Sequence, residues 1–415
     1  MNDPGRKRLR RDGRYFHRDA SHRESHAQSE LDLPPITEHP LASAAKPVTV
    51  AEAAGLAEMI EHLTAAGSFA FDSEFIGERS YEPHLCLLQA ATAERVYVVD
   101  PLAGADLGGL WELIARDDVE KIVLAGQQDF GPAVQHTGRP PANIMDVQIA
   151  AGFIHADYPL SLARLVETFL GVSLGKGMTF THWDRRPLSA VQMRYAADDV
   201  RYLPAARDVI GRRLEEAGRA DWARQECRAA LEELSVYQPP AETLYQRVRG
   251  RDRLGRRELA VLRELAVVRD AAARHEDEPP RTLVKDGVLL AMARRRVHSL
   301  EDLDRIKGLP RPFKARYGRE LAEAGARALT LPEDHWPPAE LREMPEDRER
   351  GDRVWVEIVR FCEQRSVAPA LVASRKEVVR LCHAAAAGET LDEHRLMRGW
   401  RRELLGERLD ELLKV

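Results

Sequence analysis

Two carboxylates interrupt an apolar strand pattern near the start of the chain. The run Phe69–Phe75 reads Phe-Ala-Phe-Asp-Ser-Glu-Phe, and its aromatic and apolar residues favour a buried strand. Side chains two residues apart on a strand share a face, so Asp72 and Glu74 would project side by side. Neighbouring carboxylates that lose water repel each other, and a divalent cation with oxygen ligands is the simplest way to stabilise them. Taken alone, however, an Asp-x-Glu triplet is more often a solvated pair on an edge strand.

The chain from about Val48 to Gly218 has a mixed α/β pattern. Three consecutive strands with short connections predict an antiparallel meander, whereas a later strand that alternates with helices predicts parallel pairing. The expected fold is therefore a mixed sheet covered by helices. The predicted strands are Ser68–Phe75, Leu85–Ala91, Arg95–Asp100 and Lys121–Gly126. The predicted helices are Ala51–Ala65, Leu107–Ala115, Phe130–His136, Val147–Ile154, Leu160–Leu170 and Leu188–Ala217, the last with a break near Pro204.

The rest of the chain has helical spacing. We expect a disordered basic tail over residues 1–36, the α/β domain over 45–218 and two all-α modules over 240–330 and 345–415. The similar size of the two modules suggests an internal duplication. A Pro- and acid-rich linker is predicted at Leu331–Glu349, before a second helical block at Arg353–Val415. Four helices are predicted in the first module: Arg257–Arg274, Val284–Arg295, Leu300–Ile306 and Pro312–Leu329.

Composition narrows the class of protein. The four cysteines are scattered without a CxxC pair, which argues against a structural zinc site and a disulfide framework. No apolar run is long enough to cross a bilayer, and the basic N-terminus lacks the apolar core of a secretory signal, so we expect a cytoplasmic protein. The net charge is −5, so a nucleic-acid partner would have to meet segregated basic patches.

Two further segments contain side chains that could take part in catalysis. Asp129 follows the predicted strand Lys121–Gly126, where an aspartate is either a helix N-cap or a functional acid. Tyr195 and Asp199 are four residues apart on a predicted helix and therefore share one face, either as an ordinary amphipathic pair or as part of a site. The neighbouring Asp198 points elsewhere and is predicted to be a surface residue.

The acidic pair on the first strand, Asp129 and the Tyr195–Asp199 helix, in this order, resemble the DEDD exonuclease superfamily in its tyrosine-bearing branch. The surrounding sequence resembles the ribonuclease D family. The resemblance covers about Val48 to Val415. Downstream, Arg257–Leu329 resembles the HRDC module, and the last block resembles a second, more divergent one. The segments that carry the resemblance in the first domain are Asn143–Ile154, Ser161–Leu165, Leu170–Lys176, Trp183–Leu188 and Tyr195–Leu203.

The resemblance implies a ribonuclease H-like fold and hydrolysis assisted by two divalent metal ions, Mg²⁺ or Mn²⁺. It assigns Asp72 to both ions, Glu74 and Asp199 to the ion beside the attacking water, and Asp129 to the second ion. Tyr195 would orient the water. The implied activity is 3′→5′ exoribonuclease release of mononucleotides from RNA 3′ ends, as in tRNA precursors and other small stable RNAs with 3′ extensions, by a protein expected to be a monomer.

Several positions depart from the family pattern or allow more than one interpretation. Leu124 stands where the family usually has histidine, Met145 and Val147 flank Asp146 where Phe and Thr are usual, and Thr181-His182 replace Ser-Asp before Trp183. Asp146 is interpreted as the residue that opens a helix, and Trp183 as a core residue. His22 and His26 have a ligand-like spacing but lie in the polar tail.

Two basic runs, Arg247–Arg257 and the triplet Arg294, Arg295 and Arg296, are either solvated helix faces or contacts to the RNA backbone. Nothing in the sequence reads a 2′-hydroxyl, so a 3′→5′ exonuclease that acts on single-stranded DNA is an alternative. A nucleic-acid-binding scaffold with a decayed nuclease site is another, although all five site residues are present.

Overall fold

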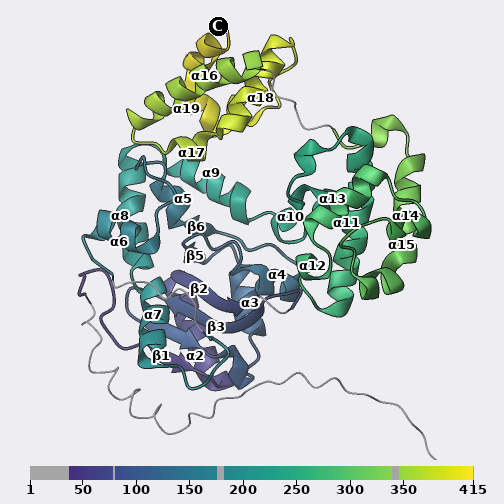
Figure 1. Ribbon diagram of the computed structural model, residues 1–415. Helices are drawn as coiled ribbons and strands as arrows, with labels where there is room; N and C mark the ends of the chain where they lie inside the picture. Colours follow the sequence, from purple (N-terminus) through teal and green to yellow (C-terminus); the bar gives the residue numbers. More distant parts are fainter. Residues whose placement is uncertain (1–36, 78–79, 175–181, 339–344, 415) are drawn as a thin grey trace, which may run out of the picture.

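The computed structural model describes residues 37–77, 80–174, 182–338 and 345–414, and its strands form one six-stranded sheet in the N-terminal half (Figure 1). The sheet order is β1-β4-β3-β2-β5-β6. Strands β2, β3 and β4 are antiparallel, as predicted, and β5 pairs parallel to β2, also as predicted. The strands are β1 (Val48–Val50), β2 (Ser68–Ile76), β3 (His84–Ala91), β4 (Val96–Val99), β5 (Glu120–Val123) and β6 (Ile144–Asp146).

The two edge strands were not predicted. β1 and β6 have three residues each, too few to show a period of two, and both pair in parallel with a longer neighbour. The predicted strand Lys121–Gly126 is also too long at its end, because the chain leaves the sheet after Val123 and Ala125 has a φ of 56°. This early exit places Asp129 in the turns that precede helix α4 (Gly131–Thr137).

Each face of the sheet packs against its own helices. One face buries aromatic and aliphatic residues against α2 (Ala53–Ala66) and α3 (Gly108–Ile114). The opposite face packs against α5 (Val147–Ala151), α7 (Ala190–Arg201) and α8 (Leu203–Glu216). Alternation along β2 assigns Phe69 and Phe71 to the first face, and Ala70, Asp72 and Glu74 to the second.

The break near Pro204 is confirmed. α7 ends at Arg201, Tyr202 lies outside both helices, and Pro204 lies in the first turn of α8, where its missing N–H costs no hydrogen bond. At its other end α7 begins with a capping box, in which the Ser189 hydroxyl accepts from the Gln192 N–H and the Gln192 side chain accepts from the Ser189 N–H. The shorter helix α6 (Leu162–Leu170) completes this side of the domain.

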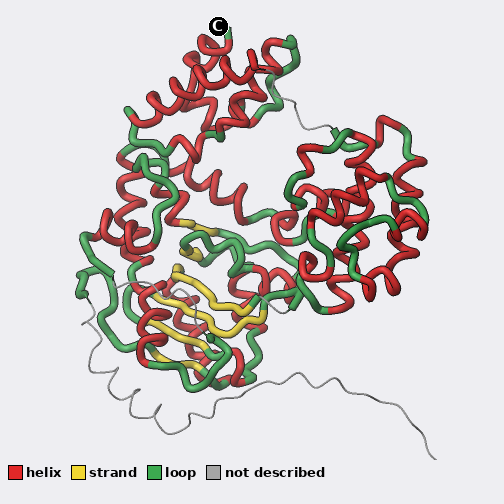
Figure 2. Tube along the Cα trace, viewed as in Figure 1, coloured by secondary structure: helices red, strands yellow, loops and turns green. Residues whose placement is uncertain are grey.

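The first all-α module is built around one long helix, α11 (Arg256–Glu276). It packs against α13 (Asp286–Arg295) and α15 (Arg311–Thr330), while α14 (Leu300–Asp304) packs against α15. All four predicted helices are therefore present, together with the short α12 (Pro280–Leu283). Figure 2 shows that every described segment after the sheet is helix or loop.

The last block contains α16 (Pro345–Glu363), α17 (Pro369–Val372), α18 (Arg375–Ala386) and α19 (Gly399–Leu413). The linker prediction Leu331–Glu349 is wrong at its end, because the acid-rich residues from Pro345 onward form the first turns of α16. Acidic side chains in the first turn of a helix interact favourably with its dipole, which explains why a composition typical of a linker forms a helix here.

Helix α9 (Ala220–Leu231), also not predicted, joins the last block to the α/β domain, and the short α10 (Leu234–Tyr237) follows it. One continuous core contains residues of α5, α8, α9 and the C-terminal helices. The Ala368 N–H donates to the Gly152 carbonyl at 2.7 Å, and the rings of Phe153 and Trp400 lie 4.7 Å apart. The C-terminal block is therefore packed onto the α/β domain rather than tethered beside it.

None of the helices in the described ranges is both long and apolar enough to span a membrane. The predicted tail over residues 1–36, including His22 and His26, lies outside the described residues, and so does Thr181.

Candidate active site

Strand β2 presents Asp72 and Glu74 on the face that α7 covers. Both residues are half-buried, and their cross-strand partners on β3 are Gln89 and Leu87. The pairing of β2 with β3 has a register irregularity between Glu74 and Phe75, near the C-terminal end of β2. The prediction that the two carboxylates lie side by side is consistent with this register.

Helix α7 brings Tyr195 and Asp199 over the same face. The helix packs against β2, β3 and β4, with Ala196, Ala197 and Val200 buried beneath it. Tyr195 and Asp199 share one face of α7, and each influences the pKa of the other, as the four-residue spacing permits. Small alanines let the helix lie close to the sheet. Asp199 consequently comes near Asp72, whose pKa it raises, and near Glu74, which raises the pKa of Asp199.

Asp129 is not a helix cap. The residue before α4 is Phe130, which makes no side-chain cap, and its ring stacks on Phe71 at 5.9 Å. The buried Asp129 carboxylate instead accepts a hydrogen bond from the Ser73 hydroxyl. Ser73 lies between the two carboxylates of β2 and was not singled out from the sequence. A hydroxyl in the middle of an Asp-x-Glu triplet is the signal that could have identified it.

The carboxylates perturb one another. Burial raises the pKa of Asp72 well above its usual value, and the charges of Asp129, Asp199 and Glu74 add to the effect. Burial and Asp129 raise the pKa of Glu74 to about 7, whereas burial, Glu74 and Asp198 raise that of Asp199 to about 8. Burial raises the pKa of Asp129 to about 6, although the Ser73 hydrogen bond opposes the rise. Raised pKa values of this kind are typical of buried acids that have no positively charged partner.

A hard divalent cation fits this donor set. All candidate ligands are carboxylate oxygens, the ligand type that Mg²⁺ and Mn²⁺ prefer. In the described part of the chain, no three His, Cys, Asp or Glu side chains are arranged to hold one ion as they stand. The Ser73 hydroxyl donates to Oδ1 of Asp129, which leaves further lone pairs on that carboxylate for an ion.

We expect the metal-free protein to lose stability as pH rises from about 5 to about 8. The folded-state pKa values of Asp129, Glu74 and Asp199, about 6, 7 and 8, exceed the unfolded values near 4. The folded state therefore binds more protons between these limits, so the free energy of unfolding falls as those protons dissociate. Thermal unfolding at several pH values checks this. The decline should be smaller in Asp199→Asn and should be reversed by Mn²⁺; equal slopes in wild type and variant would contradict it.

Arg186 fixes the segment that precedes α7. Arg186 pairs with Asp100 through two bonds of 2.5 and 2.7 Å and also donates to the Cys86 carbonyl at 2.8 Å. These bonds attach the segment before α7 to β3 and to the end of β4. Trp183 is 6% exposed and lies in a core cluster, which confirms the interpretation of a core residue.

The interpretation of Asp198 as an ordinary surface residue is wrong. Its carboxylate pairs with Arg194 at 2.5 Å and with the buried Arg201 at 2.9 Å. Arg201 in turn donates to the carbonyls of Ser43 and Ala45, so Asp198 neutralises a cation that anchors the segment before β1. A charge buried beneath a helix needs such a partner.

The interpretation of Asp146 as a helix-opening residue is confirmed. Its carboxylate accepts from the N–H groups of Gln148 at 2.9 Å and Ile149 at 3.4 Å, at the start of α5. The family departures lie beside it: Leu124 is partly buried and packs into the same core as Val147.

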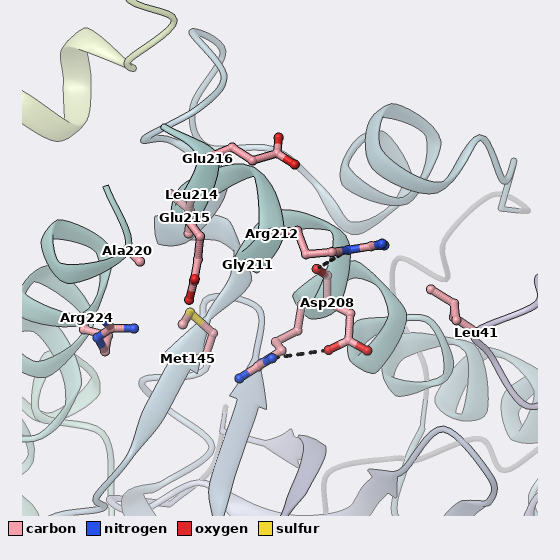
Figure 3. Close-up of a pocket in the computed structure, with 11 residues that line it drawn as sticks. Leu41, Met145, Asp208, Gly211, Arg212, Leu214, Glu215, Glu216, Ala220 and Arg224 are labelled. Carbon is pink, nitrogen blue, oxygen red and sulfur yellow. Dashed lines mark hydrogen bonds and ion pairs between the residues drawn. The ribbon is translucent and has the colours of Figure 1, made fainter. Parts of the chain in front are cut away.

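Met145 lies away from the carboxylates. Together with residues of α8 and α9 it lines a surface pocket of about 630 Å³ (Figure 3). The other labelled side chains there include Arg212, Glu215 and Arg224, a mixture of charges, and none of the five site residues lines this pocket.

The basic triplet Arg294, Arg295 and Arg296 is exposed at the C-terminal end of α13. A second basic region lies where the HRDC-like module meets the loop after β2. There the Tyr81 hydroxyl donates to Asp270 at 2.9 Å, and the Arg274 guanidinium lies 4.5 Å from the Tyr81 ring centre. Arg247, Arg274 and Arg281 help to line a cleft of about 390 Å³ between the two domains. The sequence did not predict this junction.

Comparison with known proteins agrees with the fold. Residues 47–215 match the family model described as 3′-5′ exonuclease, and residues 258–324 match the HRDC domain. The crystal structure of Escherichia coli RNase D, described as an exoribonuclease involved in structured RNA processing, has a TM-score of 0.75 and 29% identity to this chain. The match covers 89% of this chain and 99% of that one. The fold and the two family models together define a 3′→5′ exonuclease with an HRDC domain.

Curated relatives narrow this class. The chain is 33% identical over 368 residues to Ribonuclease D of Gluconacetobacter diazotrophicus, covering 87% of this chain and 91% of the relative. It is 32% identical over 371 residues to Ribonuclease D of Granulibacter bethesdensis, with the same two coverages. The chain belongs to the ribonuclease D family and is a 3′→5′ exoribonuclease, a hydrolase.

Proposed function

We propose that Asp72, Glu74, Asp129 and Asp199 hold two divalent cations, Mg²⁺ or Mn²⁺, and that the protein trims the 3′ ends of RNA by releasing mononucleotides. The observation that carries the proposal is the gathering of these acids from β2, the turn before α4 and α7, close enough that Asp129, Asp199 and Glu74 all add to the rise in the pKa of the buried Asp72. When bound, the cations would activate the attacking water and stabilise the charge on the leaving oxygen.

The position of each residue suggests its role. Asp72 lies beside Glu74 and near both Asp129 and Asp199, so it is suited to contact both ions. Glu74 and Asp199 would complete the side on which the water is held, and Asp129 the side of the leaving group. Burial and the neighbouring carboxylates raise the pKa of Tyr195, so its hydroxyl stays protonated at neutral pH. Tyr195 would therefore orient the water by a hydrogen bond and would not act as the base.

The proposed substrates are tRNA precursors and other small stable RNAs with 3′ extensions, met by a monomer in the cytoplasm. The test is incubation with a 3′-extended tRNA and Mg²⁺ or Mn²⁺, followed by mapping of the end point. Stepwise shortening from the 3′ end with mononucleotide release is expected. Parallel reactions on single-stranded RNA and DNA of one sequence separate the two polymer classes, and faster DNA trimming would overturn the RNA assignment. Failure to bind Mn²⁺ would favour a decayed site.

Tyr195→Phe should lower turnover by about 10²-fold, the cost of a misplaced reacting group. It should leave Mn²⁺ affinity close to that of the unchanged protein, because the phenol is not proposed as a ligand. Single-turnover trimming and Mn²⁺ titration measure the two effects separately. A large loss of metal affinity would mean that Tyr195 keeps Asp199 in the position needed to bind metal, rather than orienting the water.

Arg294, Arg295 and Arg296 are proposed to contact the RNA backbone. Changing all three to glutamine should weaken RNA binding and reduce the slope of log affinity against log salt by about 0.7 for each phosphate that is no longer neutralised. Arg319→Gln is the control, because Arg319 is exposed but already pairs with Glu323 at 3.4 Å. An unchanged salt slope in the triple variant would identify the triplet as a solvated helix end.

A further inference from the structure

Gln89 is a polar side chain in an apolar setting. It is 0% exposed, and neither its Oε1 nor its Nε2 atom has a hydrogen-bond partner among the described residues. A buried amide that forms no hydrogen bond destabilises the protein, and most buried polar side chains are paired. The sequence does not explain why an amide stands where its neighbours Leu88 and Ala90 are apolar.

The sheet register places Gln89 beside the catalytic carboxylates. Gln89 is the direct cross-strand partner of Asp72 on β2 and of Val98 on β4. Directly opposed residues in antiparallel strands project from the same face, with Cβ atoms roughly 4.5–5.5 Å apart. Asp72, Gln89 and Val98 therefore form one row across the sheet, beneath α7.

The described residues next to Gln89 along its own strand, and the alanines buried in α7 above it, are apolar. Along β3 the same-face neighbours of Gln89 are Leu87 and Ala91, and the buried residues of α7 above include Ala196 and Ala197. Asp72 is the polar member of the row. Its Oδ1 atom accepts from the Ser73 N–H at 2.9 Å, which leaves further lone pairs on the carboxylate for another donor.

We propose that Gln89 is a positioning residue for Asp72: its Nε2 amide donates to the Asp72 carboxylate and fixes the orientation in which that carboxylate contacts the metal ions. The inference rests on the proposed function and deepens it. Residues that hydrogen-bond to metal ligands fix ligand orientation, and their removal typically costs 10–100-fold in metal affinity. The unpaired amide then lies opposite the carboxylate whose orientation the metal site requires.

The test uses Gln89→Met, which keeps the length of the side chain and removes both polar atoms. Without metal, this variant should unfold about 2–4 °C higher than the unchanged protein, because two unpaired polar atoms disappear. Titration with Mn²⁺ alone, followed by thermal unfolding, should show affinity reduced by about 10–100-fold. A purely structural role predicts the opposite pair of results, a lower unfolding temperature and unchanged Mn²⁺ affinity, and that outcome would overturn the proposal.

Two further variants keep the result interpretable. Gln89→Asn retains the amide but shortens its reach, so Mn²⁺ affinity should fall without the gain in stability. It also serves if the methionine variant does not fold. Leu88→Met is the matched control, since it introduces the same side chain one residue away on the opposite face and should leave Mn²⁺ affinity unchanged.

Asp72→Asn in the same titration separates this inference from the proposed function. If Asp72→Asn binds Mn²⁺ as well as the unchanged protein does, the metal site itself is misassigned. If Asp72→Asn loses binding while both Gln89 variants retain it, the role of Gln89 alone is refuted.

Discussion

Replacing Asp72 with asparagine is expected to slow 3′-end trimming by at least about 10³-fold and to raise the unfolding temperature of the metal-free protein. Contact with two cations supplies several kcal/mol of transition-state stabilisation, and each 1.36 kcal/mol is a factor of ten in rate. The unfolding temperature should rise because asparagine removes a carboxyl group whose ionisation is opposed by burial and by the charges of Asp129, Asp199 and Glu74. Single-turnover trimming of a 3′-hydroxyl RNA and metal-free thermal unfolding measure the two effects, and Asp199→Asn should behave in the same way.

Asp146→Asn is the matched control for these variants. Asp146 is a buried carboxylate in the same domain, and burial raises its pKa to about 6, yet it caps α5 and does not belong to the proposed ligand set. An asparagine can cap a helix nearly as well as an aspartate. Its substitution should therefore leave trimming close to normal. Retained trimming in Asp72→Asn, or an equal loss in Asp146→Asn, would contradict the assignment of the site.

The sequence predicted those features that repeat over many residues or carry a family pattern. The meander, the parallel β5, the break at Tyr202 and the four helices of the HRDC module all follow from periodicity and from proline. Strands of three residues carry no periodic signal, so β1 and β6 were missed. Their positions depend on tertiary pairing with longer strands, which local sequence does not encode.

The sequence predicted which five residues form the candidate site, but it did not predict which other residues contact them. Spacing on β2 and α7 predicts that Asp72 and Glu74 share a strand face and that Tyr195 and Asp199 share a helix face, since both depend on local geometry. The hydrogen bond between Ser73 and Asp129, and the position of Gln89 opposite Asp72, depend on how β2 lies against the turn after β5 and against β3. Residues 56 positions apart meet there, and only the folded sheet shows which of them do.

The same limit applies to the C-terminal block. Its helices have the amphipathic spacing of a separate module, and the sequence predicted one over 345–415. The structure instead shows a core shared with α5, α8 and α9. Its polar centre is Arg401, which is 6% exposed and donates to both oxygens of Glu226 at 2.7 and 2.9 Å. Arg401 also donates to the carbonyls of Leu371 and Val372, so it joins α9, α17 and α19.

Arg401→Met is therefore expected to destabilise the nuclease domain and the C-terminal block together, by about 3 kcal/mol, the lower end of the cost of breaking a buried ion pair. The lower end applies because Glu226 keeps Arg395 at 3.1 Å and the Trp400 N–H at 2.9 Å. Calorimetric unfolding and hydrogen exchange check the result, and protection should fall in α9 and α19 alike. Arg408→Met, which removes surface pairs with Glu411 on α19 and Glu357 on α16, should change stability by less than about 1 kcal/mol. If α19 alone loses protection while α9 keeps it, the C-terminal block is an independent unit, and the continuous core does not couple the two.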